Sequence, residues 1–159
     1  MRRSSRPFRA HRCFAALLVG LLWVGTPTHA AEPSGIAIIV ARGAGGQDID
    51  RHDLALIYKR KKRFWPEGQR IAPVNLSASQ PLRRAFSSAV LGQLPEELDD
   101  YWRDQYFHGE LPPFVVGSEE AVIRFVTATP GAVGYVAACT ADKRVSVIAV
   151  VADSFPCPH

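Results

Sequence analysis

The sequence predicts an α/β fold in which layers of helix surround a central β-sheet. Short apolar, β-branched runs alternate along the chain with segments whose apolar residues recur at helical spacing. Of the 159 residues 47% are hydrophobic and 21% are charged, which supports one compact core and excludes wholesale disorder or collagen-like repetition. No apolar run reaches the roughly 18 residues of a membrane-spanning helix. We therefore expect one folded domain, over residues 31–159.

Residues 1–30 read as a secretory signal peptide. Five arginines and no acid occupy the first twelve positions, and an apolar run follows over residues 13–25. Small residues, Thr28 and Ala30, precede the expected cut, as a signal peptidase requires. The apolar run would span only about 20 Å as a helix, short of a bilayer core, so an uncleaved anchor is the weaker alternative. We expect a mature N-terminus at Ala31 and a periplasmic location.

Removing the signal peptide also removes the excess positive charge. The chain has 19 Lys and Arg against 15 Asp and Glu, and five of the arginines lie in the signal peptide, so 14 basic residues remain against 15 acidic ones. A net charge of −1, with no basic stripe carrying interleaved aromatic residues, argues against a nucleic-acid partner.

Two cysteines remain after the signal peptide, Cys139 and Cys157, 18 positions apart. An even number of cysteines in an oxidising compartment favours a disulfide. Closing a loop of this size is worth on the order of 3 kcal/mol in the chain-entropy model. No Cys-x-x-Cys spacing occurs, so a redox or metal-binding pair is the weaker alternative.

In the first half of the domain, residues 35–42 are almost wholly apolar and predict a strand buried on both faces. Apolar spacing and an acidic first turn predict a helix over about residues 51–60. Residues 64–68 contain Pro and Gly and predict a turn. A second strand is expected over residues 71–76, and Pro73 should make it an edge strand or a short one.

The second half predicts three helices and two further strands. Residues 81–91 and 95–107 are amphipathic, and each segment begins with Pro at its first helical position. Ser118 should cap a third helix. Apolar, β-branched residues predict strands over residues 132–137 and 145–151.

The most suggestive site lies between the second strand and the helix after it. Ser77 and Ser79 follow the strand, and Arg83 and Arg84 lie within the next helical turn. Backbone N–H groups at a helix start, hydroxyl donors and a guanidinium are the groups that bind an oxyanion. The alternative is that Ser77 or Ser79 simply caps the helix.

Other patterns are weaker. The basic run at residues 59–63 would suit an anionic lipid, a polyanion or an acidic partner, although a solvated helix end is the simpler interpretation. The glycine-rich residues 43–46 match neither nucleotide-binding motif, so we expect no cofactor. Asp100, Asp104 and His108 share a helix face, but no second cluster completes a metal site, and we expect none. No Gly-x-Ser-x-Gly elbow occurs, which disfavours a hydrolase.

The order of several motifs resembles the phosphate-type substrate-binding proteins of ABC importers. A helix carrying Leu-Ala-Leu-Ile-Tyr at residues 54–58 leads through basic residues to Trp65, and a strand then delivers the serine-containing helix start. Later, residues 128–136 read Ala-Thr-Pro-Gly-Ala-Val-Gly-Tyr-Val. In that family a similar helix leads to a Trp, a serine-rich loop grips the anion, and a similar Thr-Pro-Gly-Ala element enters a late strand. The resemblance covers about residues 36–138.

The resemblance implies a layered helix-sheet-helix domain like one lobe of a type II periplasmic binding protein. It implies a non-catalytic protein that binds phosphate or a similar oxyanion through Ser77, Ser79, Gln80 and Arg83, with an ABC permease or another envelope protein as partner. Family members have two lobes and a loop of Ser-Gly-Thr type, whereas this chain has Ser-Gln-Pro and enough residues for about one lobe. Three alternatives follow: weak binding, a homodimer that builds the cleft, or an interaction module that kept the lobe and lost the ligand.

Overall fold

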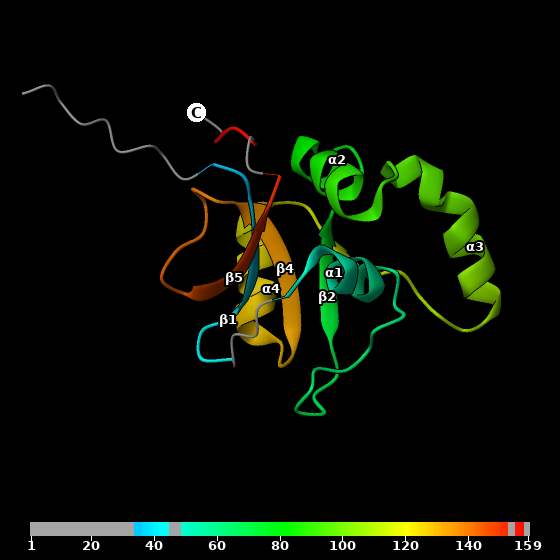
Figure 1. Cartoon of the computed structure of the whole chain (residues 1–159), viewed down its shortest axis with the longest axis horizontal. Coiled ribbons are helices and arrows are strands. Elements are labelled where there is room, and N and C mark those ends of the chain that lie inside the picture. The colour runs from blue at the N-terminus through cyan, green and yellow to red at the C-terminus, as the bar shows by residue number, and fades with distance from the viewer. Residues whose placement is uncertain (1–33, 45–48, 153–154, 158–159) are drawn as a thin grey trace, which may run out of the picture. The chain divides into compact units, whose positions relative to one another are not determined.

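The computed structural model describes residues 34–44, 49–152 and 155–157, so the expected signal peptide, residues 1–30, lies outside the described part. Most of the elements expected from the sequence are present within a residue or two of the predicted bounds (Figure 1). The elements in chain order are β1 (Ile36–Ala41), α1 (Arg51–Tyr58), β2 (Ala72–Leu76), α2 (Pro81–Phe86), the π-helical turn η1 (Ser87–Leu91), the 3₁₀ turn η2 (Pro95–Leu98), α3 (Asp99–Phe107), β3 (Phe114–Val116), α4 (Glu119–Ala128), β4 (Ala132–Ala137) and β5 (Val145–Val151).

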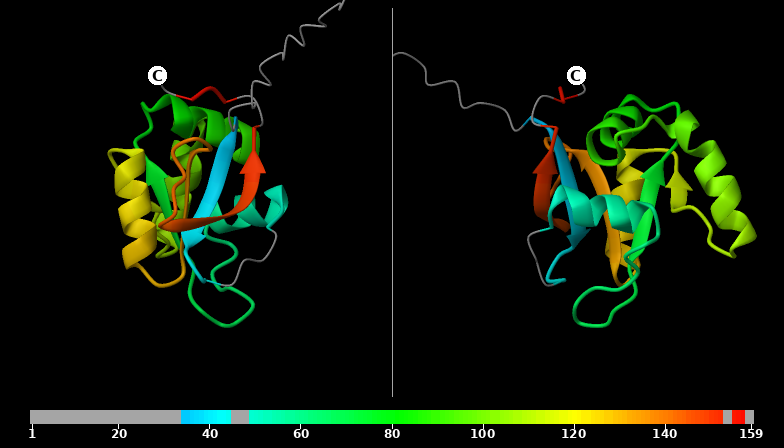
Figure 2. Two further views of the ribbon diagram at one scale, coloured as in Figure 1. Left: turned by 90° about the vertical axis from the view of Figure 1, so that its left-hand side faces the viewer. Right: turned by 45° about the vertical axis from the view of Figure 1, so that its right-hand side comes forward.

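Five strands form one mixed sheet in the order β3-β2-β4-β1-β5. Strand β2 runs parallel to β3 and β4, whereas β1 runs antiparallel to β4 and β5. Helix α4 covers one face of the sheet and α1 lies on the opposite face (Figure 2). The helix-sheet-helix layering confirms the predicted α/β class.

Two details of the sheet differ from the expectation. Strand β3 was not predicted, because it is three residues long and follows Pro112 and Pro113. Strand β2 is short, as Pro73 led us to expect, but it is not an edge strand. It pairs with β4 through Ala72 and Pro73 and with β3 only from Val74 onward. The strand changes partner beside the proline, so the missing N–H falls where one side of the strand is unpaired.

Three buried aromatic rings join the helices to the sheet. The rings of Phe86 and Tyr135 stack with centroids 3.9 Å apart, and Tyr58 meets Phe86 edge-on at 4.6 Å. Both phenols are satisfied: Tyr58 donates to the Val74 carbonyl at 3.1 Å, and Tyr135 contacts the N–H of Leu76 and the side chain of Asn75, each at 3.2 Å. The cluster therefore fixes α1 and α2 against the carboxyl end of β2.

The Trp and Thr-Pro-Gly-Ala motifs, far apart in the sequence, meet in the structure. The indole N–H of Trp65 donates to the carbonyl of Gly131 at 3.1 Å, and the N–H of Ala72 donates to the same oxygen at 3.1 Å. Gly131 has φ +75°, and a Cβ there would clash with the carbonyl oxygen of Arg70. Only glycine fits this turn without strain.

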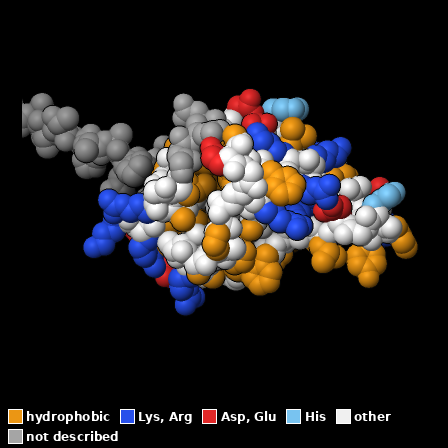
Figure 3. Space-filling model, turned by 90° about the horizontal axis from the view of Figure 1, so that it is seen from below, with side chains coloured by type: hydrophobic (Ala, Val, Ile, Leu, Met, Phe, Trp, Pro, Cys, Tyr) orange, Lys and Arg blue, Asp and Glu red, His pale blue; other side chains and the backbone are white. Residues whose placement is uncertain are grey.

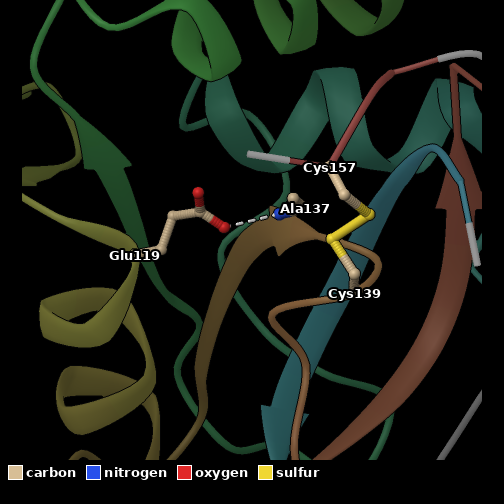
Figure 4. Close-up of a disulfide and its surroundings, with 4 residues drawn as sticks. All are labelled: Glu119, Ala137, Cys139 and Cys157. Atoms are coloured by element: carbon tan, nitrogen blue, oxygen red, sulfur yellow. Dashed lines mark hydrogen bonds between the residues drawn. A yellow bond between two sulfur atoms is a disulfide. The ribbon is translucent and has the colours of Figure 1, made fainter. Parts of the chain in front are cut away.

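The C-terminal tail lies against the start of the domain. Cys139, just after β4, and Cys157 are joined by a disulfide (Figure 4). The N–H of Gly35 donates to the carbonyl of Phe155 at 3.1 Å. The tail is thus attached at two points next to the beginning of β1.

We predict that Gly134→Ala destabilises the domain. An added Cβ would lie 2.5 Å from Cγ1 of Val122 and 3.0 Å from Cγ1 of Val74, and β-branched side chains have little rotamer freedom with which to move away. Overpacking of this kind costs about 1 to 3 kcal/mol of unfolding free energy, measurable by urea denaturation. Gly117→Ala is the matched control, because a Cβ at Gly117 meets nothing within 4 Å. Equal stability of the two variants would contradict the close packing of β4 on α4.

We also predict that the free energy of unfolding falls as the pH rises from about 10 to about 12. Burial raises the pKa of Tyr135 to about 12, against a smaller lowering by Arg83, and burial likewise raises the pKa of Tyr58 well above its usual value. The unfolded chain therefore releases these protons at a lower pH than the folded chain, which costs about 1.4 kcal/mol for each unit of pKa difference. Tyr135→Phe should be less stable at neutral pH but show a shallower fall; an unchanged slope would show that Tyr135 does not cause it.

Candidate functional site

The loop between β2 and α2 presents several hydrogen-bond donors. The side chain of Ser79 is exposed and that of Ser77 is half-buried. The N–H of Ser77 donates to the Val116 carbonyl at 3.2 Å, and the N–H of Gln80 donates to the Ser77 carbonyl at 3.0 Å. Within the described residues, the N–H groups of Ala78 and Ser79 donate to no protein acceptor. At the carboxyl end of β2, two N–H groups thus have no acceptor in the described part of the chain, and the hydroxyls of Ser77 and Ser79 lie beside them.

Neither serine caps the following helix. The N-cap residue of α2 is Gln80, no side chain makes a capping bond there, and Pro81 is the first helical residue. The side-chain Nε2 of Gln80 instead donates to the carbonyl of Gly117 at 2.6 Å. The capping alternative weighed for Ser77 and Ser79 is therefore wrong, and their hydroxyls stay available to a ligand.

Arg83, in the first turn of α2, is buried. It is 7% exposed, and its Nη1 has no hydrogen-bond partner. The Oγ of Ser87, four residues later at the start of η1, is also buried without a partner. Buried polar groups are nearly always hydrogen-bonded, so these two atoms mark a polar spot that the described side chains leave unsatisfied. Arg84 differs, because its guanidinium holds both oxygens of Glu96 at 2.9 Å.

Nothing among the described side chains neutralises Arg83. Its guanidinium influences the pKa of both Tyr58 and Tyr135, which places it near these phenols. Burial raises the pKa of each phenol, to about 12 for Tyr135, so both are neutral at physiological pH. Within the described part of the chain, no carboxylate forms an ion pair with Arg83. A buried cation without a counter-charge creates a positive potential around these phenols, of which Tyr135 contacts the end of β2.

A carboxylate that the sequence analysis had not singled out lies at the neighbouring strand end. Oε2 of Glu119 accepts a hydrogen bond from the N–H of Ala137 at 2.7 Å (Figure 4). Glu119 and Gln80 line a cavity of about 290 Å³ whose other walls include Phe155 and Pro156. The negative charge of Glu119 disfavours an anion inside this cavity. In the sequence, the only feature that marked Glu119 was its position directly after the capping Ser118. An acid at that position is also expected simply because it interacts favourably with the helix dipole.

Asp100 and Asp104 lie on α3, and His108 follows its last residue. No three His, Cys, Asp or Glu side chains are grouped as metal ligands within the described residues; Asp100 pairs with Arg103 at 2.7 Å, and Nδ1 of His108 contacts the backbone carbonyl of Asp104. In the same part of the chain, no helix is both long and apolar enough to cross a bilayer.

Comparison with solved structures places this geometry in context. No family model and no curated protein matches the sequence. An ABC-type phosphate transport receptor from Vibrio cholerae is 26% identical over 72% of this chain and 45% of its own, with a TM-score of 0.58. A protein from Clostridium perfringens, described as a phosphate ABC transporter substrate-binding protein with bound phosphate, is 23% identical over 72% of this chain and 44% of its own, with a TM-score of 0.60. PstS from Borrelia burgdorferi is 19% identical over 65% and 40% of the two chains, with a TM-score of 0.50.

In each of these matches the chain spans less than half the length of the other protein. The resemblance predicted from the motifs is confirmed, and it is a partial one. Over most of its residues, this chain has the fold of a single lobe of the phosphate ABC transporter substrate-binding proteins.

Proposed function

We propose that this chain is an exported, non-catalytic solute-binding protein that binds phosphate or a similar oxyanion at the loop between β2 and α2. The observation that carries the proposal is Arg83, a cation in the helix that follows that loop, which is nine-tenths buried and has no carboxylate partner among the described residues. The similarity to phosphate-binding proteins supports the same ligand class. Export rests on the signal peptide expected in residues 1–30, and we propose a periplasmic location.

The bound anion would lie on the solvent side of the loop. The hydroxyls of Ser77 and Ser79 and the free N–H groups of Ala78 and Ser79 would donate to its oxygens, as in other backbone anion sites. Arg83 would stabilise the anion through its positive potential. Gln80 engages Gly117 through its amide, so we assign it to positioning the loop.

One lobe leaves such a site open to water on one side, which weakens every charge-assisted hydrogen bond. We therefore propose weak binding by the isolated chain. Tighter binding would need a second surface, supplied by an ABC permease, another envelope protein or a second copy of this chain.

A second candidate is an interaction module that no longer binds an anion. Helix α3 has no buried residue and extends away from the sheet at one end of the domain (Figures 1 and 2). Large hydrophobic side chains are exposed on α3, on β3 and between them, and such side chains gather on the face seen in Figure 3. The exposed residues there are Tyr106, Phe107, Leu111, Phe114 and Val115. Exposed apolar patches commonly mark protein interfaces.

Titration calorimetry with phosphate and with sulfate tests the first candidate. We expect saturable binding at millimolar anion, weakened by about 1 to 3 kcal/mol in Ser79→Ala, as for a lost hydrogen bond to a charged group. Arg83→Met should weaken binding further, because it removes the buried charge. Arg84→Met is the matched control: it removes the same charge from the same helix, but from a guanidinium already paired with Glu96.

Circular dichroism and thermal denaturation should accompany each variant, since Arg83 contacts the core and Ser79 does not. A well-folded wild-type protein that binds neither anion would favour the interaction module. If Arg83→Met and Arg84→Met lowered the anion affinity equally, the affinity would depend only on net charge, and Arg83 would have no role in the site.

A further inference from the structure

A second site lies at the opposite end of β2 from residues 77–80, the loop between β2 and α2 that we call the serine loop. A groove of about 290 Å³ opens where β2 begins, near the segment before β3 and the end of α4. Its walls are mostly apolar and include Leu111, Pro112, Phe114 and Phe125. The rings of Phe114 and Phe125 are stacked with centroids 5.4 Å apart. The volume is close to the lower limit of about 300 Å³ for pockets that bind small organic molecules.

Arg60 reaches this groove through an unusual backbone conformation. It belongs to the basic run at residues 59–63, for which a solvated helix end was the simpler expectation. Its φ is +61°, in the left-handed region that non-glycine residues seldom adopt. Its side chain is 15% exposed, and its Nε is buried without a hydrogen-bond partner. Arg60 is therefore directed inward, unlike an ordinary solvated cation.

The charges around the groove are predominantly positive. Arg70 lines it as well, is exposed, and has no ion-pair partner within the described residues. Glu110 is the neighbouring acid: its Oε2 lies 4.0 Å from Nε of Arg60, and its other oxygen pairs with Arg63. Glu110 is thus shared between Arg60 and Arg63, and Arg70 keeps an unpaired charge among the described residues. Of the adjacent lysines, Lys62 pairs with Asp53 at 2.5 Å and adds no free charge.

We propose that this groove binds a small organic carboxylate with an alkyl or aromatic body. The guanidinium groups of Arg60 and Arg70 would hold the carboxylate, for which paired N–H donors are well matched, and the Phe114 and Phe125 rings would cover the apolar body. A singly charged head suits the site better than a phosphate dianion, because each additional charge adds to the cost of desolvation beside apolar walls. The groove and the serine loop lie at opposite ends of β2, so this site does not depend on the proposed oxyanion function.

Octanoate is the probe. Octanol has the same alkyl chain without the charge, and acetate has the carboxylate without the long alkyl chain. Two-dimensional NMR of the uniformly ¹⁵N-labelled protein should show octanoate shifting the amides of residues 70–72 and 111, 114 and 125 saturably. Octanol and acetate should each bind at least about fivefold more weakly, the difference expected for about 1 kcal/mol. Shifts at residues 77–80 should stay small, and Ser79→Ala should not change the octanoate affinity.

Two variants separate the charge from the apolar walls. Arg70→Met should weaken octanoate binding about fivefold, as for the loss of a partly exposed ion pair, and Leu111→Ser should weaken it to a similar extent. Arg51→Met, which removes an equally exposed arginine from the start of α1, should leave the affinity unchanged. Equal binding of octanol and octanoate, equal effects of Arg70→Met and Arg51→Met, or shifts confined to other residues would each overturn the proposal.

Discussion

The hydroxyl of Tyr135 holds the carboxyl end of β2 in place. It contacts the N–H of Leu76 and the side chain of Asn75, the last two residues of the strand, from the middle of β4. Its ring stacks on Phe86, so the same residue sets the position of α2. The serine loop therefore connects two elements that one buried side chain holds in place, and Arg83 is buried on the second of them. Donors on so short and constrained a loop lose little freedom when a ligand binds, which is the advantage of preorganisation.

Local periodicity was sufficient to predict most of this fold. Apolar spacing, an initial Pro or a capping Ser marked the helices, and β-branched runs marked the four longer strands. Strand β3 could not be found in this way, because its three residues carry no alternation and Phe114 and Val115 are exposed. The central position of β2 in the sheet could not be predicted either, because Pro73 has no N–H to donate and therefore favours an edge strand. Only the long-range pairing with both β3 and β4 shows how the strand accommodates this proline.

The sequence also located the serine loop but not the directions of the side chains near it. Arg83 and Arg84 are adjacent and chemically identical, yet one is buried beside two phenols and the other forms a surface ion pair with Glu96. That difference depends on how α2 is rotated against the sheet, which the aromatic cluster decides. Arg60 shows the same limit, since nothing in the basic run marks it as the residue with a left-handed φ and a side chain only 15% exposed.

The disulfide has a consequence for the edge of the sheet. Strand β5 is an edge strand, and it lies wholly within the covalent loop between Cys139 and Cys157. Edge strands are the segments that neighbouring copies of a protein most readily exchange or extend. Because the disulfide holds both flanks of β5 to its own domain, it restricts how far the strand can move away to pair with another molecule while the bond is intact. In an oxidising compartment the bond would thus protect the domain against strand exchange, a safeguard that a reducing compartment would withdraw.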